Sequence, residues 1–200
     1  MADIIYTYGG QPYLNITNQC PCACVFCIRS QHEGVGSAPT LWHQRDPAWA
    51  EIEQALEAFD FSQASEAVFC GYGEPYSALE NLKRAAAWLR AHCPGLALRV
   101  NTNGLGDLIH GRPTARELEG LADSLSISLN APNAQRYAAL CRPAFGLPSF
   151  DAMLRFAAEA RDIYPQVALS VVDVIPPEEI EQCRAIAAEL GLPLKVRHMT

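Results

Sequence analysis

Four cysteines lie within one stretch of eight residues near the start of the chain: Cys20, Cys22, Cys24 and Cys27. Thiolates this close together in sequence can all reach one soft metal centre, either Zn²⁺ or an iron–sulfur cluster. A structural Zn(Cys)₄ site is one alternative, although such sites usually draw their ligands from two separated pairs. A thiol–disulfide pair is another, because Cys24 and Cys27 have the C-x-x-C spacing.

The other cysteines are dispersed along the chain, at Cys70, Cys93, Cys141 and Cys183. We expect Cys70 and Cys183 to be core residues, since they fall on apolar segments. Cys141 precedes an Arg-Pro pair, and we consider it as a hydrogen-atom donor or as an inert thiol. No second cysteine cluster is present, so a further iron–sulfur site is not expected.

Composition and charge restrict the compartment and the partners. The N-terminus shows no secretory signal, so we expect a cytoplasmic protein whose thiols stay reduced. No apolar run approaches the roughly 20 residues of a membrane span, so no membrane contact is expected. The net charge is −7, which argues against a nucleic-acid partner.

Strand-like and helix-like segments alternate along the whole chain, with no linker that would divide it, so a single domain over residues 1–200 is expected. The first two strands flank Gly9-Gly10 and predict a β-hairpin. From Pro12 onward, six strands with helices between them predict an α/β protein with a parallel sheet. Both a three-quarter barrel and an open doubly wound sheet fit this pattern. The predicted strands are 4–8, 12–17, 66–70, 96–101, 125–129, 167–175 and 194–198.

Local signals predict where the helices begin. Asp46-Pro47 suggests a cap followed by the first helical residue. Ser77 with Glu80, and Thr114 with Glu117, have the spacing of capping boxes. The remaining helices are predicted over 133–141 and 150–164 and from residue 177 to a glycine at 191.

The spacing of three of the clustered cysteines resembles a known signature. Cys20-x₃-Cys24-x₂-Cys27, with aromatic Phe26 before the last cysteine, is similar to the motif of the radical S-adenosylmethionine (SAM) superfamily. The resemblance implies a partial (β/α)₆ TIM-like barrel of the radical SAM core type, here preceded by a short β-hairpin. It also implies a [4Fe–4S] cluster held by Cys20, Cys24 and Cys27, with SAM bound beside it. Cys22 falls outside the motif.

Motifs after the later strands carry the resemblance further. Gly71-Tyr72-Gly73-Glu74-Pro75 resembles a Gly-Gly-Glu-Pro motif that receives the SAM ammonium, although Tyr72 replaces the first glycine. An ordinary Gly/Pro turn is the alternative. Asn103 belongs to a Thr-Asn-Gly turn, and Ser128 and Asn130 would face the SAM ribose or carboxylate from alternate positions of one strand. Asp173 and His198 are near further strand ends. The resemblance thus implies these cofactor-binding residues: Phe26, Gly71, Gly73, Glu74, Asn103, Ser128, Asn130 and His198.

The whole pattern is similar to the small TatD-associated radical SAM proteins. Shared stretches include Tyr-Thr-Tyr-Gly, Asn-Gln-Cys-Pro-Cys, Gly-Tyr-Gly-Glu-Pro and Cys141-Arg142-Pro143. The implied activity is reductive cleavage of SAM to a 5′-deoxyadenosyl radical, with an electron donor such as flavodoxin or ferredoxin. We hypothesise that the radical abstracts hydrogen from a protein or peptide. A small-molecule substrate, as in deazapurine-forming members, and a zinc-stabilised binding module are the alternatives.

Cationic residues in the predicted loops offer one further hypothesis. They would either hold an anionic substrate or remain solvated, and the second alternative is preferred. These residues are Arg29, His32, Arg112, Arg136 and Arg142.

Overall fold

The computed structural model describes residues 2–199, and these form two compact units. The first unit consists of 2–20, 28–101 and 117–123. The second consists of 21–27, 102–116 and 124–199. Because both units are built from separated segments, the chain passes between them several times.

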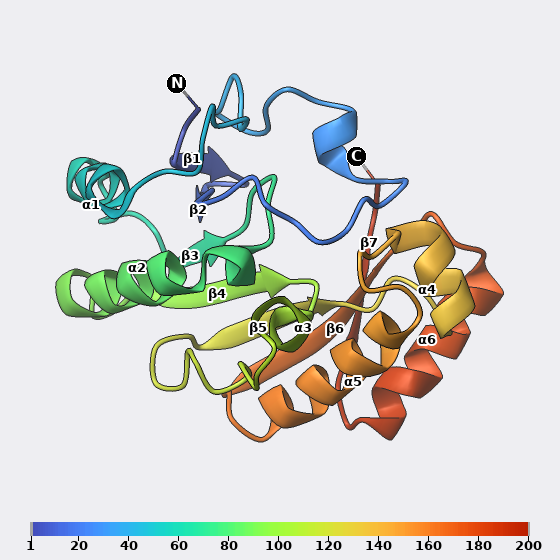
Figure 1. The fold of residues 1–200 in the computed structure, drawn as a ribbon. Helices are drawn as coiled ribbons and strands as arrows, with labels where there is room; N and C mark the ends of the chain where they lie inside the picture. The colour runs from blue at the N-terminus through green and yellow to red at the C-terminus, as the bar shows by residue number, and fades with distance from the viewer. Residues whose placement is uncertain (1, 200) are drawn as a thin grey trace. The chain divides into compact units, whose positions relative to one another are not determined.

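The first unit is built on four strands in the order β1-β2-β3-β4 (Figure 1). The first two strands are antiparallel, and the turn between them has positive φ at both Gly9 and Gly10, as a two-residue hairpin turn requires. The pairs β2–β3 and β3–β4 are parallel. The elements are β1 (Ile5–Tyr8), β2 (Gln11–Leu14), η1 (Ile28–Ser30), α1 (Trp49–Ala58), β3 (Glu66–Phe69), η2 (Pro75–Ala78), α2 (Leu79–His92) and β4 (Ala97–Thr102).

The second unit has three parallel strands in the order β5-β6-β7. Helix α5 packs against β5 and β6, and α6 packs against β6 and β7 (Figure 1). The elements are α3 (Gly106–His110), β5 (Ser124–Ser128), α4 (Ala134–Cys141), α5 (Pro148–Arg161), β6 (Gln166–Val172), α6 (Pro177–Glu189) and β7 (Leu194–Arg197).

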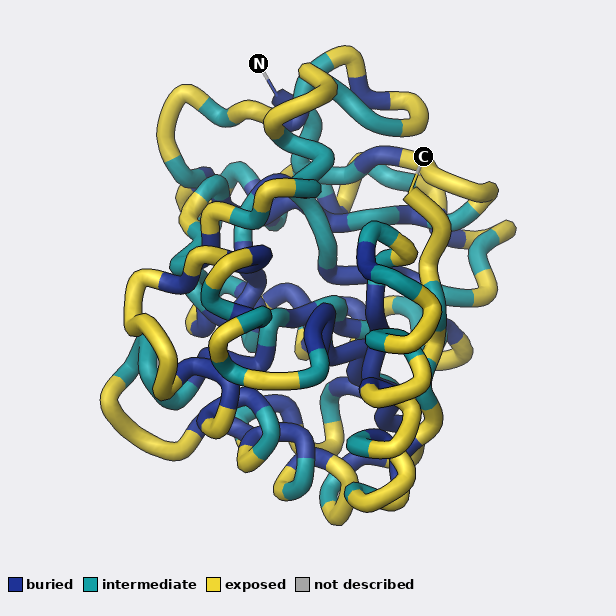
Figure 2. Tube along the Cα trace, turned by 90° about the vertical axis from the view of Figure 1, so that its right-hand side faces the viewer, coloured by how far each residue is buried: buried dark blue, intermediate teal, exposed yellow. Residues whose placement is uncertain are grey.

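The strands differ in how they are covered, and Figure 2 shows burial along the chain. Five successive residues of β6, Val167–Val171, are buried, as expected for a strand covered on both faces. In β4, buried and half-buried residues alternate, with Leu98 and Val100 buried and Arg99 and Asn101 half-buried. One face of β4 is therefore polar and less enclosed than the other.

The hairpin and the parallel strands that alternation predicted are confirmed within each unit. The helix predicted over 133–141 is present as α4, and Asn133 is its cap, since its side chain accepts a hydrogen bond from the amide of Arg136 at 2.9 Å. Pro177 begins α6, and Gly191 follows it with φ of 68°. Cys183 is fully buried on α6, which confirms it as a core residue. Cys70 is half-buried, so its assignment to the core was wrong.

Three predicted helix starts were wrong. Helix α1 begins at Trp49, and the Glu51 carboxylate accepts the amide of Ala48 at 2.8 Å, while Asp46 bonds elsewhere. Helix α2 begins at Leu79, because η2 occupies the residues where Ser77 was expected to act as a cap.

The third wrong start concerns Thr114. Its backbone amide and hydroxyl both donate to Asp107 at 2.8 Å, and residues 115–120 form turns instead of a helix. Glu117, the second member of the expected capping box, forms an ion pair with Lys83 at 2.6 Å. Cys141 is the buried last residue of α4, which agrees with the end of the helix predicted over 133–141.

We predict that Asn133→Ala lowers the free energy of unfolding by about 1 kcal/mol, because it removes the side-chain acceptor at the start of α4. In a chain of this size, that loss corresponds to a fall in Tm of about 2–4 °C, measured by thermal melting. Asn133→Asp keeps the acceptor and should melt with the parent. Equal melting of the parent and the alanine variant would contradict the capping role.

Candidate functional site

In the first unit, the chain leading into Cys20 is fixed by the carboxylate of Asp46. This carboxylate accepts the Thr17 hydroxyl at 2.8 Å, the Asn18 backbone amide at 2.9 Å and the Gln19 side-chain amide at 2.7 Å. Hydrogen bonds to a charged acceptor are stronger than those between neutral groups. Residues 17–19 are therefore held at three successive positions by one group from residues 41–46, the segment that precedes α1.

Further bonds from the 41–46 segment support the same stretch. The Asn18 side chain donates to the carbonyl of His43 at 2.7 Å and accepts the His43 amide at 3.3 Å. The buried Asn15 side chain donates to the carbonyl of Leu41 at 2.8 Å. The stretch between the end of β2 and Cys20, residues 15–19, is thus held by hydrogen bonds from the 41–46 segment.

The Gly-Tyr-Gly-Glu motif after β3 lies directly against this stretch. A Cβ atom on Gly71 would fall 2.1 Å from Oδ1 of Asn15, and one on Gly73 would fall 2.3 Å from the carbonyl oxygen of Thr17. The amide of Glu74 donates to the carbonyl of Gln19 at 2.7 Å. Both glycines are therefore required for close approach, and the predicted SAM-binding motif is positioned beside the residues that precede Cys20.

Glu74 is buried, with 4% of the residue exposed, and its carboxylate bonds to the backbone close by in the chain. Its Oε1 accepts the backbone amide of Tyr76 at 3.1 Å, so Glu74 caps η2. Because a capping carboxylate has a fixed orientation, the motif presents a preorganised backbone turn.

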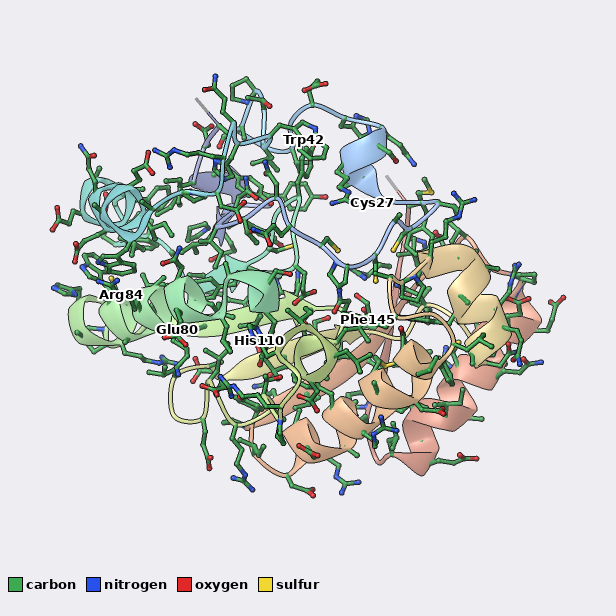
Figure 3. The ribbon with its side chains drawn as sticks, viewed as in Figure 1. Cys27, Trp42, Glu80, Arg84, His110 and Phe145 are labelled. Atoms are coloured by element: carbon green, nitrogen blue, oxygen red, sulfur yellow. The ribbon has the colours of Figure 1, made fainter. Side chains whose placement is uncertain are left out.

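Tyr72, which replaces the first glycine of the family motif, is buried and connects three segments. Its amide donates to Oδ1 of Asn15 at 3.2 Å, and its hydroxyl donates to the carbonyl of His32. Its ring packs edge-on against Trp42, labelled in Figure 3, with ring centroids 5.1 Å apart. Arg29 donates to the carbonyl of Tyr72 at 3.2 Å. The sequence does not predict this role of Tyr72, because its contacts are with residues distant in sequence and no local motif indicates them.

In the second unit, the cysteine loop, residues 21–27, pairs with the end of α4. The amide of Val25 donates to the carbonyl of Leu140 at 2.9 Å, and the amide of Ala23 donates to that of Cys141 at 3.0 Å. Cys22 forms an antiparallel bridge with Pro143. The last carbonyls of a helix have no partner within it, so the loop satisfies groups that would otherwise need water.

A largely buried group of polar side chains and thiols contacts the cysteine loop at Cys22 and the end of α4 at Cys141. Nδ2 of Asn103 donates to Sγ of Cys22 at 3.8 Å, and Nδ2 of Asn130 donates to Sγ of Cys141 at 3.8 Å. Tyr137 is 1% exposed, and its pKa is raised above the ordinary value, first by burial, then by the neighbouring thiols, and also by a hydrogen bond with Cys22. Tyr137 therefore remains a neutral hydrogen-bond donor.

Ser128 and His198 lie at the ends of β5 and β7 in the same unit. The hydroxyl of Ser128 accepts a hydrogen bond from Arg197 at 3.4 Å. The side chain of His198 is 85% exposed, and its Nδ1 lies 2.7 Å from the carboxylate of Asp173. Arg136 lies on α4 and forms an ion pair with Glu179 at 2.9 Å. Its charge is therefore paired within the protein and is not the solvated loop charge that was expected.

Each unit brings together part of the predicted site. Gly71, Gly73 and Glu74 lie beside the approach to Cys20 in the first unit, and the other predicted cofactor residues belong to the second. All eight cysteines are thiols, and those of the cluster motif are half-buried. Among residues 2–199, no three His, Cys, Asp or Glu side chains are already grouped as a metal site, so the cysteine ligand set stays a prediction.

No helix in this part of the chain is long and apolar enough to cross a membrane.

A family model described as the Radical SAM superfamily matches residues 14–190, which is most of the chain. The chain belongs to the Radical SAM superfamily. The predicted superfamily is thereby confirmed, and its members are enzymes. No curated protein matches the chain.

Solved structures of radical SAM proteins share the fold. SuiB of Streptococcus suis bound to the precursor peptide SuiA is 13% identical, with a TM-score of 0.68 over 92% of this chain and 38% of that one. A native anSMEcpe structure with AdoMet and a Cp18Cys peptide is 14% identical, with a TM-score of 0.64 over 94% and 50%. TsrM of Kitasatospora setae, a methyltransferase with cobalamin and a [4Fe–4S] cluster, is 11% identical, with a TM-score of 0.55 over 90% and 32%.

These likenesses establish the fold class as the predicted α/β partial TIM-like barrel of the radical SAM core type. The chain spans half or less of the length of these three proteins. What they bind and act on is therefore a property of those proteins, and its extension to this radical SAM protein is a proposal.

We predict that Gly73→Ala lowers the free energy of unfolding by about 1–3 kcal/mol, because the added methyl group would force residues 71–74 away from Thr17 and Gln19. Gly95→Ala is the matched control, since a Cβ there meets open space. Urea titration of both variants measures the difference. Equal stability of the two variants would contradict the close packing at Gly73.

We predict that the carboxyl group of Asp173 has a pKa below the usual range of aspartates. The pKa of Asp173 is lowered by hydrogen bonds from the His198 ring and the Met199 amide. The stabilisation that follows from this shift is present above the unfolded-state pKa of about 3.9 and is lost as pH falls through the lower folded-state value. In His198→Ala, NMR titration should show the midpoint moved upward; an unchanged midpoint would contradict the pairing.

Proposed function

We propose that this protein binds a [4Fe–4S] cluster through Cys20, Cys24 and Cys27 and cleaves SAM reductively. The observation that carries the proposal is the spacing of these three thiols on a loop whose two flanks are fixed by hydrogen bonds. Asp46 fixes the residues before Cys20, and the end of α4 holds residues 21–25.

The residues present suit a cluster with an open coordination position. The three thiols are half-buried and none is in a disulfide, and as thiolates they would bind three of the four irons. Cys22 differs from them, since it is 5% exposed and its sulfur already accepts the amide of Asn103. When bound, the cluster would deliver one electron to SAM, whose C–S bond would break to give methionine and a 5′-deoxyadenosyl radical that abstracts hydrogen from the substrate.

The chain's own residues would bind and orient SAM. The preorganised turn at Gly71, Gly73 and Glu74 would receive the methionyl ammonium, since carbonyl and carboxylate oxygens accept its protons. Phe26 would contact adenine from the cysteine loop. The polar residues at or just after the ends of β4, β5 and β7 would hold the rest of the molecule: Asn103, Ser128, Asn130 and His198.

The substrate, the partner and the compartment form the finer part of the proposal. We assign the protein to the TatD-associated group on the shared stretches of sequence, and we infer a protein or peptide substrate. Support comes from SuiB and anSMEcpe, whose structures hold peptides. We further infer flavodoxin or ferredoxin as the electron donor and a cytoplasmic location, where a reducing compartment would keep the eight cysteines as thiols.

The test is anaerobic reconstitution with iron and sulfide, followed by addition of SAM and a strong reductant. We predict about four irons per chain and release of 5′-deoxyadenosine. Alanine at Cys20, Cys24 or Cys27 should abolish both, because each removes a ligand. Cys93→Ala, at a half-buried thiol outside the loop, should behave like the parent.

Two outcomes would overturn the proposal. A colourless parent protein that holds one zinc ion would establish the zinc-stabilised module instead. A fully reconstituted brown protein that releases no 5′-deoxyadenosine would leave the cluster in place and remove the SAM chemistry.

A further inference from the structure

Two strand-end asparagines donate to buried thiols that lie outside the cluster motif, and they differ in what their oxygens do. Asn103 donates to Cys22, and its Oδ1 accepts the amide of Leu105 at 2.9 Å. Asn130 donates to Cys141, and its Oδ1 is buried and accepts no hydrogen bond within the structure. Of these two asparagines, only Asn130 therefore presents a buried oxygen that no group of the described residues satisfies.

The backbone of Asn130 is left-handed and is held by a hydrogen bond. Its φ is 57°, in the region that asparagine adopts more readily than most residues other than glycine, and its backbone amide donates to the carbonyl of Ser170 at 3.2 Å. The residue is 5% exposed. Such a conformation, held by its surroundings around an unsatisfied polar atom, is characteristic of functional sites.

We propose that Cys141 is a positioning residue that fixes the side-chain amide of Asn130, so that its oxygen is directed toward bound SAM. This inference rests on the proposed function. Because the sulfur of Cys141 takes the N–H side of the amide, the remaining oxygen can only accept. Of the two SAM groups that the resemblance implies for Asn130, the ribose hydroxyls can donate to its oxygen and the carboxylate cannot, so Cys141 would hold the amide in the orientation that suits the ribose.

Cys141 also couples this amide to the cysteine loop. Its Sγ accepts from Asn130, and its backbone carbonyl accepts the amide of Ala23. The thiol is 1% exposed, so its place is set by packing at the end of α4. One buried residue thus connects the loop to the predicted ribose contact, and a ligand that reaches Oδ1 would displace the groups that now shield it.

The first measurement is made on the apo-protein and needs no cofactor. In the parent, the Nδ2 protons of Asn130 should be protected from solvent exchange, as observed by ¹⁵N NMR. Cys141→Ala should remove that protection, because the acceptor is lost. Cys141→Ser should keep it, because a hydroxyl also accepts. Cys183→Ala is the matched control, since it removes an equally buried thiol from the core of α6.

The second measurement is the Kd of reconstituted protein for SAM and for methylthioadenosine, a nucleoside with the ribose but without the carboxylate. Cys141→Ala should weaken both ligands about fivefold, the size of one lost neutral hydrogen bond. Cys141→Ser should stay within about twofold, and Cys183→Ala should match the parent.

Each result separates this inference from the proposed function. Unchanged protection of Asn130 in Cys141→Ala overturns the positioning role, even if SAM is cleaved normally. Loss of affinity for SAM alone, with methylthioadenosine unaffected, overturns the ribose assignment. A reconstituted parent that binds no SAM refutes the proposed function, and the apo-protein measurement then still decides whether Cys141 orients Asn130.

Discussion

The carboxylate of Asp46 is the constraint on which the first part of the site depends. It accepts three hydrogen bonds from three consecutive residues, Thr17 to Gln19. The carbonyls of that fixed stretch then define a surface so close to Gly73 that no side chain fits between them. The first predicted cluster ligand and the predicted SAM-binding turn thus share a single support, made by residues that take no part in the chemistry.

The second part of the site depends on the end of helix α4. Helix carbonyls without partners are normally satisfied by water or by a cap. Here the amides of the cysteine loop satisfy them, and the thiols of Cys22 and Cys141 accept amide protons from the asparagines after β4 and β5. Cysteines that are not in the cluster motif thereby acquire a structural function that their position in the sequence did not indicate.

The sequence was informative where a signal is local and periodic. Alternating apolar runs and Gly9-Gly10 predicted the hairpin and the parallel strands, because burial on both faces leaves a continuous apolar pattern. Capping signals were less reliable. Asp46 and Thr114 have the right residue type for a cap, yet distant and neighbouring partners use their side chains for other bonds. Tyr72 is a departure from the motif in sequence. In the structure it holds the segment 28–46 through its hydroxyl, which donates to the carbonyl of His32, and its ring, which packs against Trp42. No sequence pattern predicts these contacts.

The proposed chemistry depends on one feature above all: a cluster held by three cysteines would keep an open position at which SAM would bind. Its most direct test is electron paramagnetic resonance of the reduced, reconstituted protein with SAM labelled with ¹⁵N at the ammonium and ¹⁷O at the carboxylate. We expect a change in the cluster signal on addition of SAM and resolved coupling to both labels. A cluster signal that is identical with and without SAM, with no coupling to either label, would contradict the account.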